Sequence, residues 1–286
     1  MLRQTDMMGV THDKVQRAID RLRAFEPPEG YYVAFSGGKD SQCIYHLCKQ
    51  AGVKFDAHYS VTSVDPPELV RFIREQYSDV SRDVPHDKDG KPITMWSLIA
   101  KKGMPPTRFV RYCCKELKES GGKGRLVVTG VRWAESVNRA KKRGVVNAFD
   151  GTTLNDDNAE TRRYVEQCYR TRKTLINPIV DWSTEDVWEY LNEVAKVPHC
   201  CLYDEGFDRL GCIGCPLAGH KKRCREFERW PIYRDNYLRA FARMIERKPK
   251  DRPTKYTSAQ AVMDLWLREK TKEPLKGQID MWEGES

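Results

Sequence analysis

The sequence has no long apolar run. Nowhere in its 286 residues does it approach the roughly 18–20 consecutive apolar residues that span a bilayer, and the opening stretch MLRQTDMMGVTHDK lacks the apolar core of an export signal. We therefore expect a cytoplasmic protein with no membrane partner. Ten cysteines in such a protein indicate metal ligands, redox groups or buried apolar side chains rather than a disulfide framework.

Acidic residues are fewer than basic ones. The chain carries 41 Asp and Glu against 50 Lys and Arg, a formal net charge of +9. This balance favours polyanionic partners such as nucleotides, sulfate esters or nucleic acid, and it is equally typical of a soluble protein with a basic surface. The length fits one large domain, or one domain with an appendage.

Strand and helix patterns alternate along most of the chain. Apolar strands are predicted at 31–35, 54–61, 125–131 and 174–182, and helices at 12–25, 40–52, 66–77 and 183–194. Ser183 followed by Asp186 is a variant of the capping box that starts a helix. The alternation predicts an α/β fold with a mostly parallel, helix-covered, Rossmann-like sheet.

Two segments stand apart from this alternation. Residues 141–163 are polar and rich in turn formers, which predicts a mobile loop, a lid or an ordinary insertion. The basic composition and helical spacing of residues 220–286 predict a basic helical C-terminal extension. Arginines there alternate with aromatic residues, which suits either a polynucleotide surface or a helical bundle that covers the sheet; they are Arg223, Arg225, Arg229, Arg234 and Arg239 with Trp230, Tyr233 and Tyr237.

The stretch AFSGGKDS, residues 34–41, lies between a predicted strand and a predicted helix. Gly37 and Gly38 let backbone amides approach an anion at the helix N-terminus. Lys39 and the hydroxyls of Ser36 and Ser41 complete a cradle for phosphate or sulfate. The stretch is not a Walker A loop and lacks the dinucleotide Gly-x-Gly-x-x-Gly pattern.

SGGKDS in this position resembles the PP-loop of the adenine nucleotide alpha-hydrolase-like superfamily. Residues 129–143, TGVRWAESVNRAKKR, and residues 177–191, NPIVDWSTEDVWEYL, resemble two further segments of the phosphoadenosine phosphosulfate (PAPS) and adenosine phosphosulfate (APS) reductase family. The three motifs occur in the family's order, and the chain is identified as similar to that family over residues 31–216. The resemblance implies an enzyme that binds ATP, APS or PAPS.

The resemblance also implies which residues form the site. Lys39, Asp40, Arg132 and Arg139 are expected to be catalytic, because arginines fork onto phosphate or sulfate oxygens and Glu135 can orient one of them. With ATP we expect Mg²⁺, with Asp40 as a ligand. The nucleotide is expected to contact Ser36, Gly37, Gly38, Lys39, Asp40, Ser41, Val61, Thr62, Ser63, Gly130, Arg132 and Glu135.

Four cysteines form a ligand pattern. Cys212 and Cys215 make a Cys-x-x-Cys turn, and Cys113 and Cys114 are adjacent, with Lys118 among the basic residues that can offset thiolate charge. Four cysteinates suit tetrahedral zinc or a [4Fe–4S] cluster, and adjacent cysteines reach two irons of one cluster more easily than one small ion. The resemblance to iron–sulfur APS reductases implies a [4Fe–4S] cluster within a domain of residues 1–219.

The resemblance fails at one point. Reductases of this family carry a nucleophilic cysteine in a C-terminal Glu-Cys-Gly-x-His tail, whereas the last cysteine here is Cys224. We therefore expect ATP-pyrophosphatase-type activation coupled to sulfur transfer, for example to nucleic acid, with a sulfur donor such as a cysteine desulfurase. The alternatives are a true reductase that uses Cys200, Cys201, Cys224 or a partner's thiol, and a four-cysteine zinc module that binds nucleic acid. The oligomeric state stays open.

Overall fold

The computed structural model describes every residue except 6–10, 120, 149, 171–172, 248–255 and 269–286. The C-terminal tail considered above therefore lies outside the described residues. The chain divides into two compact units: the first comprises 1–95 and 112–212, and the second comprises 96–111 and 213–286. Within the part of the chain that the structure describes, no helix is long and apolar enough to span a membrane.

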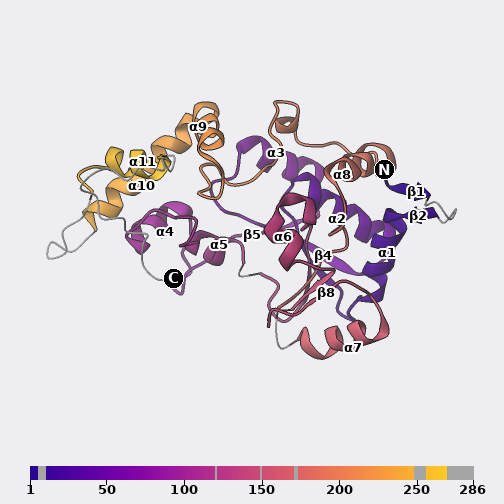
Figure 1. The fold of residues 1–286 in the computed structure, drawn as a ribbon. Helices are drawn as coiled ribbons and strands as arrows, with labels where there is room; N and C mark the ends of the chain where they lie inside the picture. The colour runs from indigo at the N-terminus through magenta and orange to yellow at the C-terminus, as the bar shows by residue number, and fades with distance from the viewer. Residues whose placement is uncertain (6–10, 120, 149, 171–172, 248–255, 269–286) are drawn as a thin grey trace. The chain divides into compact units, whose positions relative to one another are not determined.

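The first unit contains a seven-stranded sheet, which confirms the predicted fold class (Figure 1). Its strand order is β5-β4-β3-β6-β9-β7-β8. The strands are β3 (Tyr31–Ala34), β4 (Phe55–Ser60), β5 (Ser81–Asp83), β6 (Leu126–Val128), β7 (Val146–Asn147), β8 (Thr153–Leu154) and β9 (Thr174–Ile176). The first five in spatial order are parallel, and β7 pairs antiparallel with both β9 and β8. A separate antiparallel pair joins β1 (Arg3–Thr5) to β2 (Thr11–Asp13).

The helices follow the predicted strand–helix alternation. Those of the first unit are α1 (Lys14–Ala24), α2 (Lys39–Ala51), α3 (Pro67–Gln76), α5 (Tyr112–Leu117), α6 (Val137–Lys142), α7 (Ala159–Cys168) and α8 (Thr184–Glu189). Short turns of other helix types are η1 (Trp133–Glu135), η2 (Tyr190–Val194) and η3 (Cys201–Tyr203). Helix α2 packs against both α1 and α8.

The strand order has a switch point between β3 and β6. The chain runs outward from β3 to β4 and β5, then returns to place β6 on the other side of β3. Ligands of such sheets bind at the carboxyl ends of the strands that flank this point. Here those ends lead into the PP-loop after β3 and into Thr129–Arg132 after β6.

The predicted loop at 141–163 is more ordered than expected. It contains the end of α6, the paired strands β7 and β8, and the start of α7. The buried side chains of Val145 and Val146 pack into the sheet edge, and Asn147 Nδ2 donates to Thr153 Oγ1 at 2.9 Å. Two short strands were missed because their apolar segment is only two residues long.

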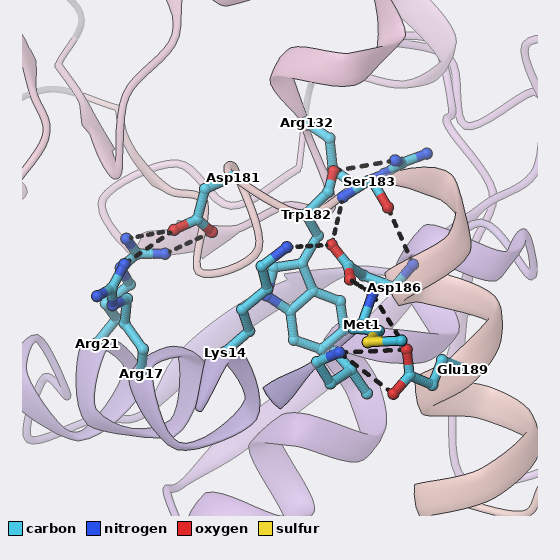
Figure 2. A network of polar contacts seen from close by, with 11 residues as sticks. Met1, Lys14, Arg17, Arg21, Arg132, Asp181, Trp182, Ser183, Asp186 and Glu189 are labelled. Carbon is cyan, nitrogen blue, oxygen red and sulfur yellow. Dashed lines mark hydrogen bonds and ion pairs between the residues drawn. The ribbon is translucent and has the colours of Figure 1, made fainter. Parts of the chain in front are cut away.

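The predicted capping box at the start of α8 is confirmed. Asp186 N donates to Ser183 Oγ at 3.1 Å, and Ser183 N donates to Asp186 Oδ2 at 2.8 Å. The fully buried Asp186 also accepts hydrogen bonds from Lys14 Nζ at 2.5 Å and from the Met1 amino group at 3.0 Å (Figure 2). Burial alone would raise the pKa of Asp186, but these donors hold it at about 2.

Replacing Asp186 by asparagine should destabilise the fold by about 2 kcal/mol at neutral pH. Because the folded pKa lies below the ordinary value of 3.8, the carboxylate stabilises the fold above about pH 4, and this contribution disappears as the pH falls toward 2. Urea unfolding at several pH values tests this. The exposed Glu193 is the control: Glu193→Gln should change the free energy of unfolding by less than about 0.5 kcal/mol. A pH-independent gap between wild type and Asp186→Asn would contradict the assignment.

The second unit is built from helices around an aromatic core. Its helices are α9 (His220–Arg229), α10 (Pro231–Glu246) and α11 (Ala259–Leu267), joined by most of α4 (Met95–Lys102). Tyr237 lies at the centre, with ring centroids 4.8 Å from Trp266 and 5.0 Å from Trp96. Trp266 Nε1 donates to Pro106 O at 2.7 Å. These contacts explain why 96–111 belongs to this unit, whereas the sequence predicted a boundary after residue 219 and no contribution from earlier residues.

Two of the three aromatic residues of the predicted polynucleotide surface lie in the core. Tyr237 and Trp230 are buried, so they act as core residues and not as platforms for stacking bases, whereas Tyr233 is half-buried. Arg223 is also buried, whereas Arg225, Arg229 and Arg239 are exposed. Arg225, Arg229 and Arg239 therefore keep the solvent-facing position that a polynucleotide surface requires.

Candidate functional site

The PP-loop forms a tight turn at the carboxyl end of β3. Gly37 has φ +71°, and a Cβ there would lie 2.6 Å from Ile73 Cγ1, so glycine is required for both conformation and space. Ser41 Oγ donates to Gly38 O at 2.8 Å and accepts from Ser36 N at 3.2 Å. The two serines therefore stabilise the loop itself.

Lys39 is the first residue of α2 and is only 5% exposed. Its backbone N–H donates to the Tyr203 hydroxyl at 2.8 Å, and its Nζ donates to Asp208 O at 2.7 Å. Both donors thus point to oxygen atoms of the 203–208 segment. An anion that binds here takes the place of the Tyr203 hydroxyl, because one N–H cannot serve both acceptors well. Burial, with the charges of Arg132 and Arg209, lowers the pKa of Lys39.

Arg132 comes from the neighbouring strand end and is 2% exposed. Its Nε donates to Asp40 Oδ1 at 2.7 Å. Its Nη1 donates to Trp182 O at 3.2 Å (Figure 2). A Cβ at Gly130 would lie 2.8 Å from Asp40 O, so glycine allows the β6 end to approach the first turn of α2. Two predicted site segments, separated by about 90 residues of sequence, therefore meet at the switch point.

Further basic side chains surround this point. Glu135 pairs with Arg139, and its other oxygen lies 3.6 Å from Arg209 Nη1. Burial, together with the charges of Arg209 and Arg143, lowers the pKa of Arg139 to about 10. Such a shift indicates that the positive charges repel one another. The site therefore has an excess of positive charge that a bound anion would relieve.

The predicted adenine and ribose segment follows β4. Ser63 has φ +64°, which is rare for a residue with a side chain and marks local strain. Thr62 is completely buried, and its hydroxyl donates to Asp65 Oδ2 at 2.7 Å, so this side chain is committed to the protein interior. Val61 and Ser63 keep partial exposure. Their contact with a nucleotide stays a prediction.

Three of the four predicted cysteine ligands, Cys113, Cys114 and Cys212, belong to the first unit and interact electrostatically. A hydrogen bond with Cys114, burial, and the charges of Cys114 and Cys212 raise the pKa of Cys113. Cys212 and, less strongly, Asp65 raise the pKa of Lys118, whose side chain hydrogen-bonds Cys212. Lys118 is thus the cation that the structure places beside these thiols.

Cys215 belongs to the second unit and follows a turn with its own anchors. Gly214 N donates to Glu226 Oε2 at 2.8 Å, and the Tyr237 hydroxyl donates to Ile213 O at 3.0 Å. Gly214 has φ +71°, and a Cβ there would lie 2.6 Å from Phe227 Cζ. The turn before Cys215 is therefore held in one conformation that requires glycine.

The four predicted cysteine ligands fall in both units of the chain. Among the described residues, no group of three or more His, Cys, Asp or Glu side chains is arranged to hold one metal ion. The thiolates of a [4Fe–4S] cluster bind different irons and stand farther apart than the ligands of one ion. Thiolates with a nearby cation are the donor type of such a cluster, and the four cysteines stay its predicted ligands.

A surface cavity of about 510 Å³ lies away from these groups. It is lined by residues 12–13, by α1 and by 155–157, and its charged residues include Arg17 and Arg21 as well as Asp13, Asp20 and Asp156. Since both signs of charge line it, it has no preference for an anion. At the PP-loop, the Tyr203 hydroxyl accepts the hydrogen bond of the Lys39 backbone N–H.

Sequence reasoning missed the residues that complete the anion site. Tyr203, Asp208 and Arg209 all lie in the stretch LYDEGFDRLGC, which predicted only a cysteine ligand. The available signal was the presence of a tyrosine and an arginine shortly before Cys212 in this stretch, but nothing local shows that the stretch folds back onto Lys39.

A model of the phosphoadenosine phosphosulfate reductase domain matches residues 30–218. This protein belongs to that family, as its motifs predicted. An uncharacterised protein of Methanocaldococcus jannaschii is 29% identical over 232 residues, which are 73% of this chain and 42% of that protein. An adenosine 5'-phosphosulfate reductase of Allochromatium vinosum is 27% identical over 158 residues, 53% of either chain. The chain thus spans about half the length of these relatives, or less.

Among solved structures, the phosphoadenylyl-sulfate reductase of Candida auris in a phosphate complex aligns with a TM-score of 0.43 and 17% identity. The alignment covers 68% of this chain and 87% of that one.

Proposed function

We propose that this protein is a PP-loop enzyme that activates a substrate with ATP, releases pyrophosphate, and couples this step to sulfur transfer. The observation that carries the proposal is that two buried basic side chains, Lys39 and Arg132, come from the two segments that meet at the switch point of the sheet, with Arg132 bonded to Asp40 in the first turn of α2. Such preformed donors are suited to a polyphosphate whose charge increases during reaction.

The donors act mainly on the leaving group. The Lys39 backbone N–H and ammonium stabilise the charge that develops on pyrophosphate, and burial strengthens both interactions. Asp40 fixes the Arg132 guanidinium through its 2.7 Å hydrogen bond, and Glu135 does the same for Arg139. With Mg²⁺ bound to ATP, these side chains need only position the triphosphate for in-line attack.

We propose that Cys113, Cys114, Cys212 and Cys215 hold a [4Fe–4S] cluster. When bound, the cluster supplies a redox-active or sulfur-binding centre. Two observations support this: Lys118 offsets thiolate charge at Cys212, and Gly214 constrains the turn before Cys215. A hydrogen bond from the Cys212 thiol to Thr62 Oγ1, at 3.9 Å, connects the ligand set to the segment after β4.

The sulfur acceptor that we propose is nucleic acid, and the proposed donor is the persulfide of a cysteine desulfurase. The exposed arginines Arg225, Arg229 and Arg239 support phosphate contacts by the second unit. The net charge of +9 supports the same class of partner.

A second candidate is reduction of an adenylyl sulfate to sulfite. The similarity to the adenosine 5'-phosphosulfate reductase of Allochromatium vinosum favours it. It needs a nucleophilic thiol, for which the half-buried Cys224 and the exposed Cys201 have the access.

One assay separates the two candidates. The anaerobically purified protein is incubated with ATP and Mg²⁺, or with APS and reduced thioredoxin, and pyrophosphate and sulfite are measured. We expect pyrophosphate from ATP and no sulfite from APS. Sulfite release without pyrophosphate would replace the proposed function with the second candidate.

A further inference from the structure

The loop that follows α4 ends in a tight turn with an exposed tip. Thr107 N donates to Val110 O at 3.2 Å, and Val110 N donates to Thr107 Oγ1 at 2.9 Å. These two bonds close a turn that has Arg108 and Phe109 at its tip. Among the described residues, Phe109 is the most exposed aromatic side chain, at 71%. The PP-loop and the proposed cluster use neither tip residue.

The base of this turn is anchored in the aromatic core of the second unit. Pro105 and Pro106 are buried, and Pro106 O accepts a hydrogen bond from Trp266 Nε1 at 2.7 Å. Consecutive prolines restrict the backbone to few conformations, so the turn has a fixed place on the core. A side chain that is already ordered loses little conformational entropy when it binds a partner. Phe109 is therefore suited to contact a flat apolar surface.

The surroundings of Phe109 are strongly basic. Residues 96–111 contain no Asp or Glu, and their four basic residues are all exposed: Lys101, Lys102, Arg108 and Arg111. The second unit contains 21 Lys and Arg against 11 Asp and Glu, whereas the first contains 29 against 30. The net charge of +9 therefore comes from the second unit, and such an excess attracts polyanions.

An exposed aromatic ring beside basic side chains is the arrangement by which proteins bind unpaired bases. The ring stacks on the face of a base, and arginine or lysine side chains contact the neighbouring phosphates. A duplex does not offer this contact, because its base faces are covered by the adjacent base pairs. Phe109 therefore favours a single strand over a duplex.

We propose that the turn at Arg108 and Phe109 binds a single-stranded segment of nucleic acid, with an unpaired base stacked on Phe109 and phosphates at Arg108. The inference rests on the proposed function and specifies its acceptor as an unpaired stretch of RNA or DNA. The sequence predicted stacking by Trp230 and Tyr237, which are buried in the core. Phe109 supplies the stacking surface that these two residues do not.

The surface of an anionic membrane is the main competing partner for a phenylalanine with basic neighbours. The apolar part of this turn is small: Val110, at 40%, is the only other exposed large apolar side chain of residues 103–111. A membrane-binding segment buries a wider apolar face than this. Stacking needs only one ring with phosphate contacts beside it, so the observations favour nucleic acid.

The test measures binding of the full-length protein to fluorescein-labelled oligouridylate and oligothymidylate of about 16 nucleotides, and to a DNA duplex of the same length. We expect Phe109→Ala to weaken binding of the single strand about tenfold, and binding of the duplex less than about twofold. The loss with either strand supports the proposal, and the strand that binds more tightly identifies the acceptor as RNA or DNA. Unchanged binding of both strands would overturn it.

Two further substitutions at Phe109 separate stacking from general apolar contact. Phe109→Tyr keeps the ring and should bind the single strand within about twofold of wild type, whereas Phe109→Leu should weaken binding as much as Phe109→Ala. Ile232, 62% exposed on α10, is the matched control: Ile232→Ala should bind as wild type does. Wild-type binding by Phe109→Leu would show an apolar contact without stacking and would contradict the proposal.

Arg108 provides an independent measurement. Arg108→Gln removes one phosphate contact, so the slope of the logarithm of the binding constant against the logarithm of the salt concentration should fall by about one. An unchanged slope would contradict the role of Arg108. Phosphatidylserine vesicles are the last arm, because vesicle binding that requires Phe109, without binding of either strand, would replace nucleic acid by a membrane.

The wild-type protein is also assayed for pyrophosphate release from ATP. Binding of a single strand that depends on Phe109, without pyrophosphate release, would contradict the proposed activation step alone. Pyrophosphate release without such binding would contradict the role of the turn alone.

Discussion

Replacing Lys39 by alanine is expected to reduce pyrophosphate release from ATP by about 100-fold or more. The variant loses the ammonium that now bonds Asp208 O in a buried position, and with it the charge that faces the leaving pyrophosphate. The backbone N–H is retained, so binding of ATP should weaken less than turnover. Single-turnover release of pyrophosphate, with ATP binding measured separately, provides the two numbers.

Lys49 is the matched control because it lies on the same helix. Its exposed ammonium forms a 3.4 Å ion pair with the exposed Asp79, far along α2 from the PP-loop. Lys49→Ala should leave turnover within about twofold, since exposed ion pairs contribute little. Unchanged turnover in Lys39→Ala would exclude a catalytic role for the loop lysine.

Replacing Gly214 by alanine should lower the iron content of the purified protein to less than about half of wild type, through strain of a few kcal/mol in the ligand turn. The new Cβ would lie 2.6 Å from Phe227 Cζ, and alanine disfavours φ +71°. Relief of this strain moves Ile213 and Cys215 from their present positions. Iron and sulfide analysis, together with the visible absorption spectrum, measures the effect.

Gly211 provides the control on the other side of Cys212. A Cβ there meets nothing within 4 Å, so Gly211→Ala should keep wild-type iron. Wild-type protein with one zinc and no iron would contradict the proposed cluster itself. Equal iron loss in both variants would show that the conformation of Gly214 is not the cause.

Local patterns were sufficient for the strand–helix alternation and for the loop between β3 and α2. The 31–35 strand, the glycine turn and the 40–52 helix are each visible in a short window, because alternation of apolar and polar residues reports burial directly. The capping pair Ser183 and Asp186 was equally readable, since both partners lie within one turn. The two-residue strands β7 and β8 were not, because they are stabilised by pairing and not by their own sequence.

The second unit shows what residue types and their spacing cannot predict. The spacing of Tyr237 and Phe241 predicts a helix face, but not whether that face meets solvent, nucleic acid or another helix. Trp96, more than a hundred residues earlier in the sequence, packs on Tyr237 and completes the core. The buried Arg223 looks in the sequence like the exposed Arg225 two residues later.

The sequence by itself determined the family, the PP-loop and its lysine, the arginines after β6 and the cysteine pattern, because each of these depends on residue types at short spacing. Only the tertiary structure decided what shares a site with them. It brings Tyr203 and Asp208 onto the donors of Lys39, sets Arg132 against Asp40, and joins the His220 ring to the carbonyl of Leu267. These are contacts across long stretches of chain or through a backbone carbonyl, and no local pattern encodes the distance between such atoms.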